Sequence, residues 1–218
     1  NYPLEDWIFT PESARDRLLK HFETRSLKGF GVQNLHLGIV AAGAVLQYLD
    51  MTEHRQVAHI TALSRIEEEK YVWLDRFTMR NLELFQALNE GGCSFIDVVD
   101  HTLTPMGSRM LKRWVALPLK DVDAIAERQA VVESFFREPE LKEELAAELK
   151  PVGDLERLVS KVAAGRLSPR EMRQLGRALQ HLVPIKAACE GAADLALQHL
   201  GQDLDACREM AERIHREL

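Results

Sequence analysis

The sequence predicts a mainly α protein, with a helical core domain, a small β element near residues 57–85 and long helices at the C-terminal end. Signals for helix starts recur along the chain, most clearly where a serine or threonine precedes a proline. Apolar residues repeat at three- and four-residue spacing from about residue 94 onward, as on one side of a helix. With 218 residues, 46% of them hydrophobic and 28% charged, the chain is long enough to bury a core.

The N-terminal part is expected to form two helices joined by a turn-rich link. Thr10 as N-cap and Pro11 in the first turn begin the first helix. The link is SLKGFGV at residues 26–32, and a nearly all-apolar helix, LHLGIVAAGAVLQYLD, follows at residues 35–50. This helix has no polar side, so we expect it to be buried on most sides. Its apolar run at residues 38–49 is too short to span a membrane.

The segment from residue 57 to 85 differs in composition from the rest of the chain. It holds short stretches of β-branched and aromatic residues, such as Tyr71, Val72 and Trp73. These residue types favour extended backbone. We therefore expect two or three short strands here, within a chain that is otherwise helical.

The chain after about residue 94 is expected to be helical throughout. The first helix begins with Thr104 as N-cap and Pro105 in its first turn, and it runs to Leu117. Four further starts are placed, in order, at Asp121 or Asp123, Pro139, Asp154 and Ser168, and a last helix begins near residue 203. We expect four apolar residues of the helix after Asp121 to lie on one face: Ile125, Val132, Phe135 and Phe136.

The helix that begins at Ser168 has the strongest start signal in the chain. Ser168 is the N-cap, Pro169 takes the first helical position, and Glu171 completes a capping box. The apolar side chains of this helix and of the last one form narrow stripes: Met172, Leu175, Leu179 and Leu182, then Cys207, Met210, Ile214 and Leu218. A narrow stripe indicates one shallow contact seam, so we expect an extended arm. Pro184 is expected to kink or end the first of these helices.

The chain carries no sequence motif for catalysis, cofactor binding or metal binding, so we expect no catalytic, cofactor-binding or metal-binding residue in it. The Gly-Lys pair of a phosphate-binding loop does not occur, and GFG at residues 29–31 is more typical of a turn than of dinucleotide binding. His54 and His59 are five residues apart and would diverge on a helix. The cysteines lack a CxxC pair, as in a cytoplasmic chain without disulfides: Cys93, Cys189 and Cys207.

Residues 102–119, TLTPMGSRMLKRWVALPL, combine two methionines, a tryptophan and three strong bases in one helix. Met106, Met110 and Trp114 form one line that we expect to face the core, with Leu111 and Val115 beside it. The bases fall on another face: Arg109, Lys112 and Arg113. A packed helix with a solvated outer face explains this pattern, and a phosphate-binding basic patch is the alternative.

Two further residue types in this part of the sequence carry an expectation. Gly107 lies in the first turn of the helix, where it would allow close approach of another backbone. The tryptophans are expected to be core or semi-core anchors: Trp7, Trp73 and Trp114.

Two stretches resemble the core domain of the MutS family of DNA mismatch-recognition proteins: LDRFTMRNLELF at residues 74–85, and residues 102–119. The resemblance continues in both directions and covers nearly the entire chain. SLKGFGV and AAGAVLQYL at residues 41–49 are similar to the passage from the family's connector domain into the core. Three later stretches are similar to the core running into the lever helices: IAERQAVVE (125–133), GDLERLVSKV (153–162) and SPREMRQLGRAL (168–179).

The resemblance implies a domain organisation. Residues 1–32 would be the end of the connector domain and a linker, residues 33–150 the core domain, and residues 151–218 the lever helices before the clamp. In the family, a mismatch-reading domain with a Phe-x-Glu motif precedes these parts. A DNA-gripping clamp and a C-terminal ATPase domain with the P-loop and the dimer contact follow them. The chain begins at Asn1 and ends without a helix stop signal, so we interpret it as a piece of a longer protein.

The resemblance also implies a role, which is to transmit conformational change between the ATPase and the clamp in mismatch repair. The implied partner is mismatched double-stranded DNA, reached through a homodimeric cytoplasmic parent whose absent domain binds ATP and magnesium. No catalysis, membrane partner or small-molecule substrate is expected, and a net charge of −6 argues against a chain that grips DNA over its whole surface. The alternative is a free-standing helical scaffold or adaptor that binds a partner protein.

Overall fold

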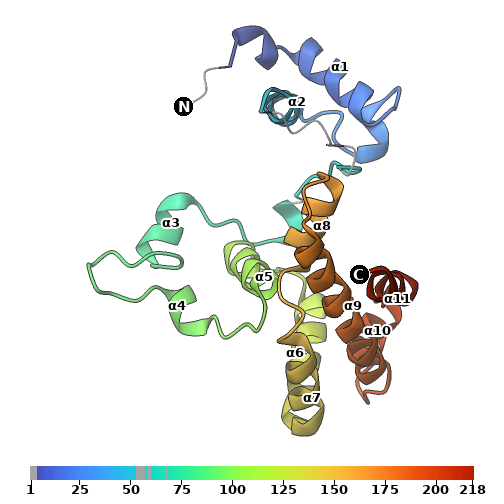
Figure 1. Cartoon of the computed structure of the whole chain (residues 1–218). Helices are drawn as coiled ribbons and strands as arrows, with labels where there is room; N and C mark the ends of the chain where they lie inside the picture. The colour runs from blue at the N-terminus through green and yellow to red at the C-terminus, as the bar shows by residue number, and fades with distance from the viewer. Residues whose placement is uncertain (1–3, 53–56, 58–59, 67) are drawn as a thin grey trace. The chain divides into compact units, whose positions relative to one another are not determined.

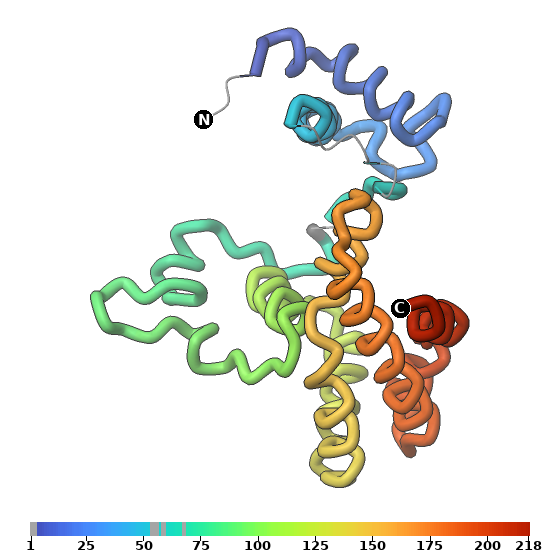
Figure 2. The backbone as a smooth tube through the Cα atoms, in the orientation of Figure 1, coloured from blue at the N-terminus to red at the C-terminus, as the bar shows by residue number. Residues whose placement is uncertain are grey.

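The computed structural model describes residues 4–52, 57, 60–66 and 68–218, and its helical content confirms the predicted mainly α class. Figure 1 labels the helices, and Figure 2 traces the backbone from the N-terminus to the C-terminus. The chain divides into two compact units: Asn1–Ile66 with Ser160–Leu167, and Glu67–Val159 with Ser168–Leu218. Among the described helices, none is both long and apolar enough to cross a membrane. The expected domain boundaries at residues 32 and 150 stay predictions.

The first unit is built around two α-helices, α1 (Pro11–His21) and α2 (His36–Met51), with 3-10 turns before each. In Figure 1, α2 is seen end-on beside α1. Thr10 caps α1 as predicted, since its side-chain oxygen accepts a hydrogen bond from the Ser13 amide at 3.3 Å. The buried core of this unit consists of Ala14, Leu18, Leu27, Val32, Ile39 and Leu46.

The apolar helix α2 is not buried on most sides, which corrects the prediction for residues 35–50. One side is buried against the rest of the unit, through residues that include Ile39 and Leu46. The other side is exposed: Leu37, Val45, Tyr48 and Met51. The physical reason is that α1 covers one face of α2 and the described residues supply no second layer over the opposite face.

The second unit begins with a lobe of two short helices, α3 (Arg76–Asn81) and α4 (Phe95–Val99), beside α5 (Pro105–Ala116) in Figure 1. The following helices are α6 (Val122–Arg137), α7 (Pro139–Leu149), α8 (Leu155–Ala163), α9 (Pro169–Glu190), α10 (Leu195–Asp203) and α11 (Arg208–Glu217). The division between the two units falls within α8, after Val159. The sequence did not predict α10, and the last helix therefore begins at Arg208 rather than near residue 203.

Side-chain caps fix the predicted helix starts. Thr104 Oγ1 accepts a hydrogen bond from the Gly107 amide at 3.1 Å, and Asp121 Oδ1 accepts one from the Ala124 amide at 2.8 Å. Before α9, Ser168 forms the predicted capping box with Glu171. The starts at Pro139 and after Asp154 are confirmed as well.

The strands predicted for residues 57–85 are not formed in the described part of that segment. One isolated antiparallel bridge joins Tyr71 to Leu119. The extended backbone ends at Asp75, because the Asp75 carboxylate caps α3 and accepts hydrogen bonds from its first amides. A strand needs a neighbouring strand to pair with. The β-prone residues before Asp75 pair at Leu119 alone, through Tyr71, and so form a bridge instead of a sheet.

Helix α9 is the central element of the C-terminal half of this unit, since α7, α10 and α11 all pack against it. The core here consists of Leu145, Val152, Ile185, Cys189, Ala192 and Leu197. Leu175, Gly176, Ala178 and Leu179 are also buried, so the contact face of α9 is wider than the predicted single seam. The small residues Gly176 and Ala178 allow this close packing. The helix continues through Pro184 to Glu190, so the proline does not end it.

The tryptophans are not core anchors, contrary to the prediction. Trp7 is 52% exposed, Trp73 is 63% exposed and Trp114 is 42% exposed. An indole ring has a large surface, and neighbouring side chains cover only part of it at these three positions.

Candidate functional site

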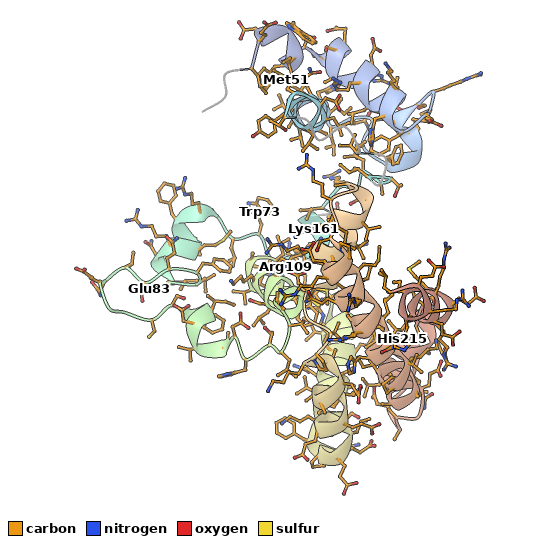
Figure 3. All side chains as sticks on the ribbon, in the orientation of Figure 1. Met51, Trp73, Glu83, Arg109, Lys161 and His215 are labelled. Carbon is orange, nitrogen blue, oxygen red and sulfur yellow. The ribbon has the colours of Figure 1, made fainter. Side chains whose placement is uncertain are left out.

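The candidate site is the junction of α5 with the start of α8, which we call the α5–α8 junction and define by Arg109, Asp154 and Glu156. Arg109 belongs to α5, while Asp154 and Glu156 flank the first residue of α8. Figure 3 labels Arg109. The Asp154 side chain also accepts a hydrogen bond from the Arg157 amide at 3.2 Å, so it caps α8 as predicted.

The guanidinium of Arg109 holds both carboxylates at once. Its two terminal nitrogens donate to the two oxygens of Asp154, at 3.0 and 2.7 Å, in a bidentate pair. Its Nε and one terminal nitrogen donate to Glu156 Oε2, at 3.0 and 2.6 Å. A planar guanidinium with two-point contacts fixes direction as well as distance. The junction therefore ties α5 to the N-terminal end of α8 in one orientation.

The electrostatics of the junction follow from these hydrogen bonds. The Arg109 guanidinium holds the pKa of the Asp154 carboxyl below its usual value. The same contacts, with Asp154 first, raise the pKa of Arg109. Each group favours the charged form of the other, so both are charged over the neutral pH range.

The second base, Lys112, is exposed, and carboxylates lie near it. Its positive charge contributes to the lowered pKa of Asp97 and of Asp100. The larger causes are hydrogen bonds: the Ser94 side chain donates to Asp97 at 2.6 Å, and Ser108 donates to Asp100 at 2.5 Å. Arg109 and Lys112 therefore lie against negative charge, and this weakens the reading of the three bases as a phosphate-binding patch.

The buried face of α5 is formed by a line of residues shifted by one position from the predicted line. Gly107, Leu111 and Val115 are half-buried, while Met110 and Trp114 are exposed. A shift of one residue turns a helix face by about 100°, so the 107–111–115 line packs where the 106–110–114 line was expected. Met106 is the exception, because it packs against the core cluster.

The prediction that Gly107 allows close approach of another backbone is wrong. A Cβ at this position would lie 3.2 Å from Thr102 Cβ and 3.3 Å from Thr104 Oγ1. These distances are tighter than ordinary contact, so the glycine accommodates the side chains of the turn that precedes α5.

An apolar groove lies between α5 and α6, lined among others by Trp114, Ile125, Val132 and Phe136. The Arg128 guanidinium carbon lies 3.7 Å from the centre of the Trp114 ring in a cation–π contact. Phe136 is 81% exposed, whereas its neighbour Phe135 packs against the core. The predicted α6 face is therefore split, because adjacent helical positions point in different directions.

The described residues hold no cluster of three or more His, Cys, Asp or Glu side chains that could bind a metal ion. His54 and His59 lie outside the described residues. The glycines of residues 29–31 form a turn as predicted, since Gly31 follows a 3-10 turn and has a φ of 68°. The contacts of the α5–α8 junction are thus ties between helices, and the expectation of no catalytic residue stays a prediction.

The α5–α8 junction does not follow from the sequence. The partners of Arg109, Asp154 and Glu156, are 45 and 47 positions away from it. No local periodicity connects positions so far apart. The acidic residues at the start of α8 carried a signal for a helix N-terminus, but none for an arginine partner.

Comparisons with known proteins agree along the whole chain. A model of MutS domain III matches residues 77–218, and a model of MutS domain II matches residues 1–61. The chain is similar to the DNA mismatch repair protein MutS of Parabacteroides distasonis (58% identical over 217 residues), of Bacteroides fragilis (55% over 217) and of Cytophaga hutchinsonii (53% over 213).

These alignments cover 100%, 100% and 98% of this chain, but 25% of each relative. The chain thus spans about a quarter of the length of the curated relatives that it matches. The domain III match alone extends over more than half of the 218 residues. The chain therefore belongs to the MutS family and corresponds to its domain II and domain III segments.

Proposed function

We propose that this chain is the structural core and lever segment of a MutS-like mismatch repair protein, and that it transmits conformational change between an ATPase domain and a DNA-binding clamp. The chain itself carries no catalysis in this proposal. ATP and magnesium would be bound by another domain of a homodimeric parent, and mismatched double-stranded DNA would be the partner of that parent. The curated relatives, each named a DNA mismatch repair protein, support this assignment.

The observation that carries the proposal is the α5–α8 junction. Transmission over a distance needs stiff elements with defined contacts at their ends. Arg109 holds the first turn of α8 through four hydrogen bonds. A short link leads from α8 to α9, a helix of 22 residues with a complete capping box and three packing partners. A displacement of α5 would therefore be passed to α8 rather than absorbed in a loose contact.

The test is a pair of titrations on a protein of the relatives' full length that carries this sequence. DNA affinity is measured with and without ATP, and nucleotide affinity with and without mismatched DNA. Coupling between binding sites is reciprocal, so Arg109→Gln should bring both coupling factors toward one together. Arg113→Gln removes an equal charge from an exposed position of the same helix and should leave both couplings intact. A folded Arg109→Gln protein with both couplings unchanged contradicts the proposal.

The second candidate function is a free-standing scaffold or adaptor that binds a partner protein. The exposed apolar surface on α2 and in the α5–α6 groove fits that reading too. The family assignment favours the lever segment, because the relatives place a matching segment inside a chain about four times as long. If the chain were an adaptor, Arg109→Gln would leave the coupling between DNA and nucleotide unchanged in the same titrations.

A further inference from the structure

We infer that the arginine-bearing face of α9, together with His215 of α11, binds the phosphate backbone of duplex DNA. We call this place the α9–α11 hollow and define it by Arg173, Arg177, Gln180 and His215, which line it. The inference rests on the proposed function, because it takes duplex DNA as the partner. It goes beyond that function by assigning to the lever segment itself a contact with DNA that does not depend on sequence or mismatch.

The hollow is formed by a close approach of two helices. At Gly176 an added Cβ would lie 2.6 Å from Ile214 Cγ2, so α9 and α11 touch where α9 has no side chain. Arg173 and Arg177 flank Gly176 along α9, and His215 follows Ile214 on α11. The two helices thus bring their polar side chains to the rim of one depression. Figure 3 labels His215 on α11.

The side chains at the rim are donors without acceptors of their own. Arg173, Arg177, Gln180 and His215 are all exposed. None of the four has a hydrogen-bond or ion-pair partner among the described residues, whereas Arg213 on α11 is already paired with Glu217 at 3.0 Å. Within the described part of the chain, the side chains that line the hollow include no aspartate or glutamate, and Leu218, the last residue of the given sequence, lines it as well. Two glutamates of α11 lie near His215 in the sequence and are not part of the lining: Glu217, two residues after it and paired with Arg213, and Glu212, one turn before it.

The spacing of the arginines suits an extended anion rather than one small ion. Arg173 and Arg177 are four residues apart, so they lie about 5–6 Å from each other on one side of the helix. Arg170 extends the same line one turn toward the start of α9, where the helix dipole is also positive. A row of arginines with a glutamine and a histidine is the donor set that proteins use toward backbone phosphates. A chain of phosphates could contact several of these donors in succession.

The bases of α5 are a weaker candidate for the same role. Arg109 is held by Asp154 and Glu156, and Lys112 lies near Asp97 and Asp100. Neutralised bases release few counterions on binding DNA and therefore contribute little affinity. The chain has a net charge of −6, so the DNA contact must be local, and in the described part of the chain the α9–α11 hollow brings unpaired arginines of one helix together with a histidine of another.

The experiment measures binding of the 218-residue chain to a labelled matched duplex and to the same duplex with one mismatch, over a series of salt concentrations. The test variant is Arg173→Gln/Arg177→Gln. The control is Arg137→Gln/Arg213→Gln, which removes two charges from arginines already paired with Glu133 and Glu217. Affinity falls as salt rises, and each phosphate contact contributes about −0.9 to the slope of log affinity against log salt. The test variant loses two contacts, so its salt dependence should be weaker, with a slope smaller in magnitude by about 2. The control should keep the slope of the wild type.

Binding of both duplexes with equal affinity, lost in the test variant and kept in the control, supports the inference. Three results overturn it: no duplex binding by the wild type at low salt, an equal loss in both variants, or tighter binding of a polyglutamate peptide through the same arginines. The last result would assign the hollow to an acidic protein segment. Each of these leaves the proposed function standing, because the coupling titrations test the α5–α8 junction and do not involve Arg173 or Arg177.

Discussion

Gly43 of α2 lies so close to Ala14 of α1 that a Cβ on Gly43 would stand 2.6 Å from the Ala14 Cα. The neighbouring atom is backbone and cannot rotate away, so the two helices would have to separate. We expect Gly43→Ala to lower the free energy of unfolding of the first unit by roughly 1–3 kcal/mol, as for overpacked cores. Chemical denaturation followed by circular dichroism measures the effect.

The matched control for Gly43 is on the same helix. At Gly38 an added Cβ would meet nothing closer than Leu35 Cβ at 3.4 Å, an ordinary contact. Gly38→Ala should therefore be neutral or stabilising by up to about 1 kcal/mol, since alanine favours the helix. Equal effects of the two substitutions would mean that α1 and α2 are not in contact at Gly43.

The exposure of Trp114 leads to a second prediction. Leu175 is 4% exposed and Trp114 is 42% exposed. Leu175→Ala should cost about 2–5 kcal/mol, as for buried leucines. Trp114→Ala should lower the free energy of unfolding by less, about 1–2 kcal/mol, because it removes the contact with Arg128 and a ring that is only partly buried. Urea denaturation of both variants tests this order, and a larger loss for Trp114→Ala would contradict the observed orientation of α5.

These helices show which features of the fold a sequence can predict. The starts at Thr104 and Ser168 follow from contacts with amides three residues away, and both were predicted correctly. Such contacts are local, and the residue types that make them are few. The face of α5 could not be predicted as reliably, because two lines of apolar residues one position apart are equally plausible until the neighbouring helices are placed.

The site was harder to predict than the fold for the same physical reason. The pairing of Arg109 with Asp154 depends on tertiary structure, and the hollow beside Gly176 depends on the approach of α11 to α9. The short strands expected near Tyr71 are not formed in the described residues, because no neighbouring strand pairs with them there. Composition shows what a segment favours, whereas the available partners decide what it forms.

The ion pair of the α5–α8 junction predicts how stability depends on pH. The folded-state pKa of Asp154 is lowered, chiefly by Arg109. Its stabilisation is therefore present above the ordinary carboxyl value of about 4 and is lost as the pH falls through the lower folded-state value. The difference in unfolding free energy between wild type and Asp154→Asn should be largest near neutral pH and should shrink in acid.

The measurement for Asp154 is a series of denaturation curves from neutral pH into the acid range. Asp203→Asn, at an exposed position in α10, controls for the loss of one negative charge. It should change stability little at any pH. An Asp154→Asn difference that stays constant as the pH falls would show that the ion pair with Arg109 does not contribute.

The stiffness of α9 gives the last prediction, which concerns a protein of the relatives' full length that carries this sequence. A proline within α9 removes one backbone hydrogen bond and clashes with the preceding turn, at a cost of about 3 kcal/mol or more in helix stability. Leu175 is a poor place for it, because Leu175 is buried and its loss would damage the core as well. Gln174 is exposed on the same turn, so Gln174→Pro interrupts the helix and leaves the buried side chains in place, while Gln174→Ala serves as the matched control.

If α9 transmits between the two ends of the protein, Gln174→Pro should spare ATP binding in another domain and weaken the effect of ATP on DNA affinity. It should equally weaken the effect of mismatched DNA on nucleotide affinity, because coupling between binding sites is reciprocal. A folded Gln174→Pro protein in which both effects match those of Gln174→Ala would show that a continuous α9 is not needed, and the transmission role would then have to be assigned to other helices of the segment.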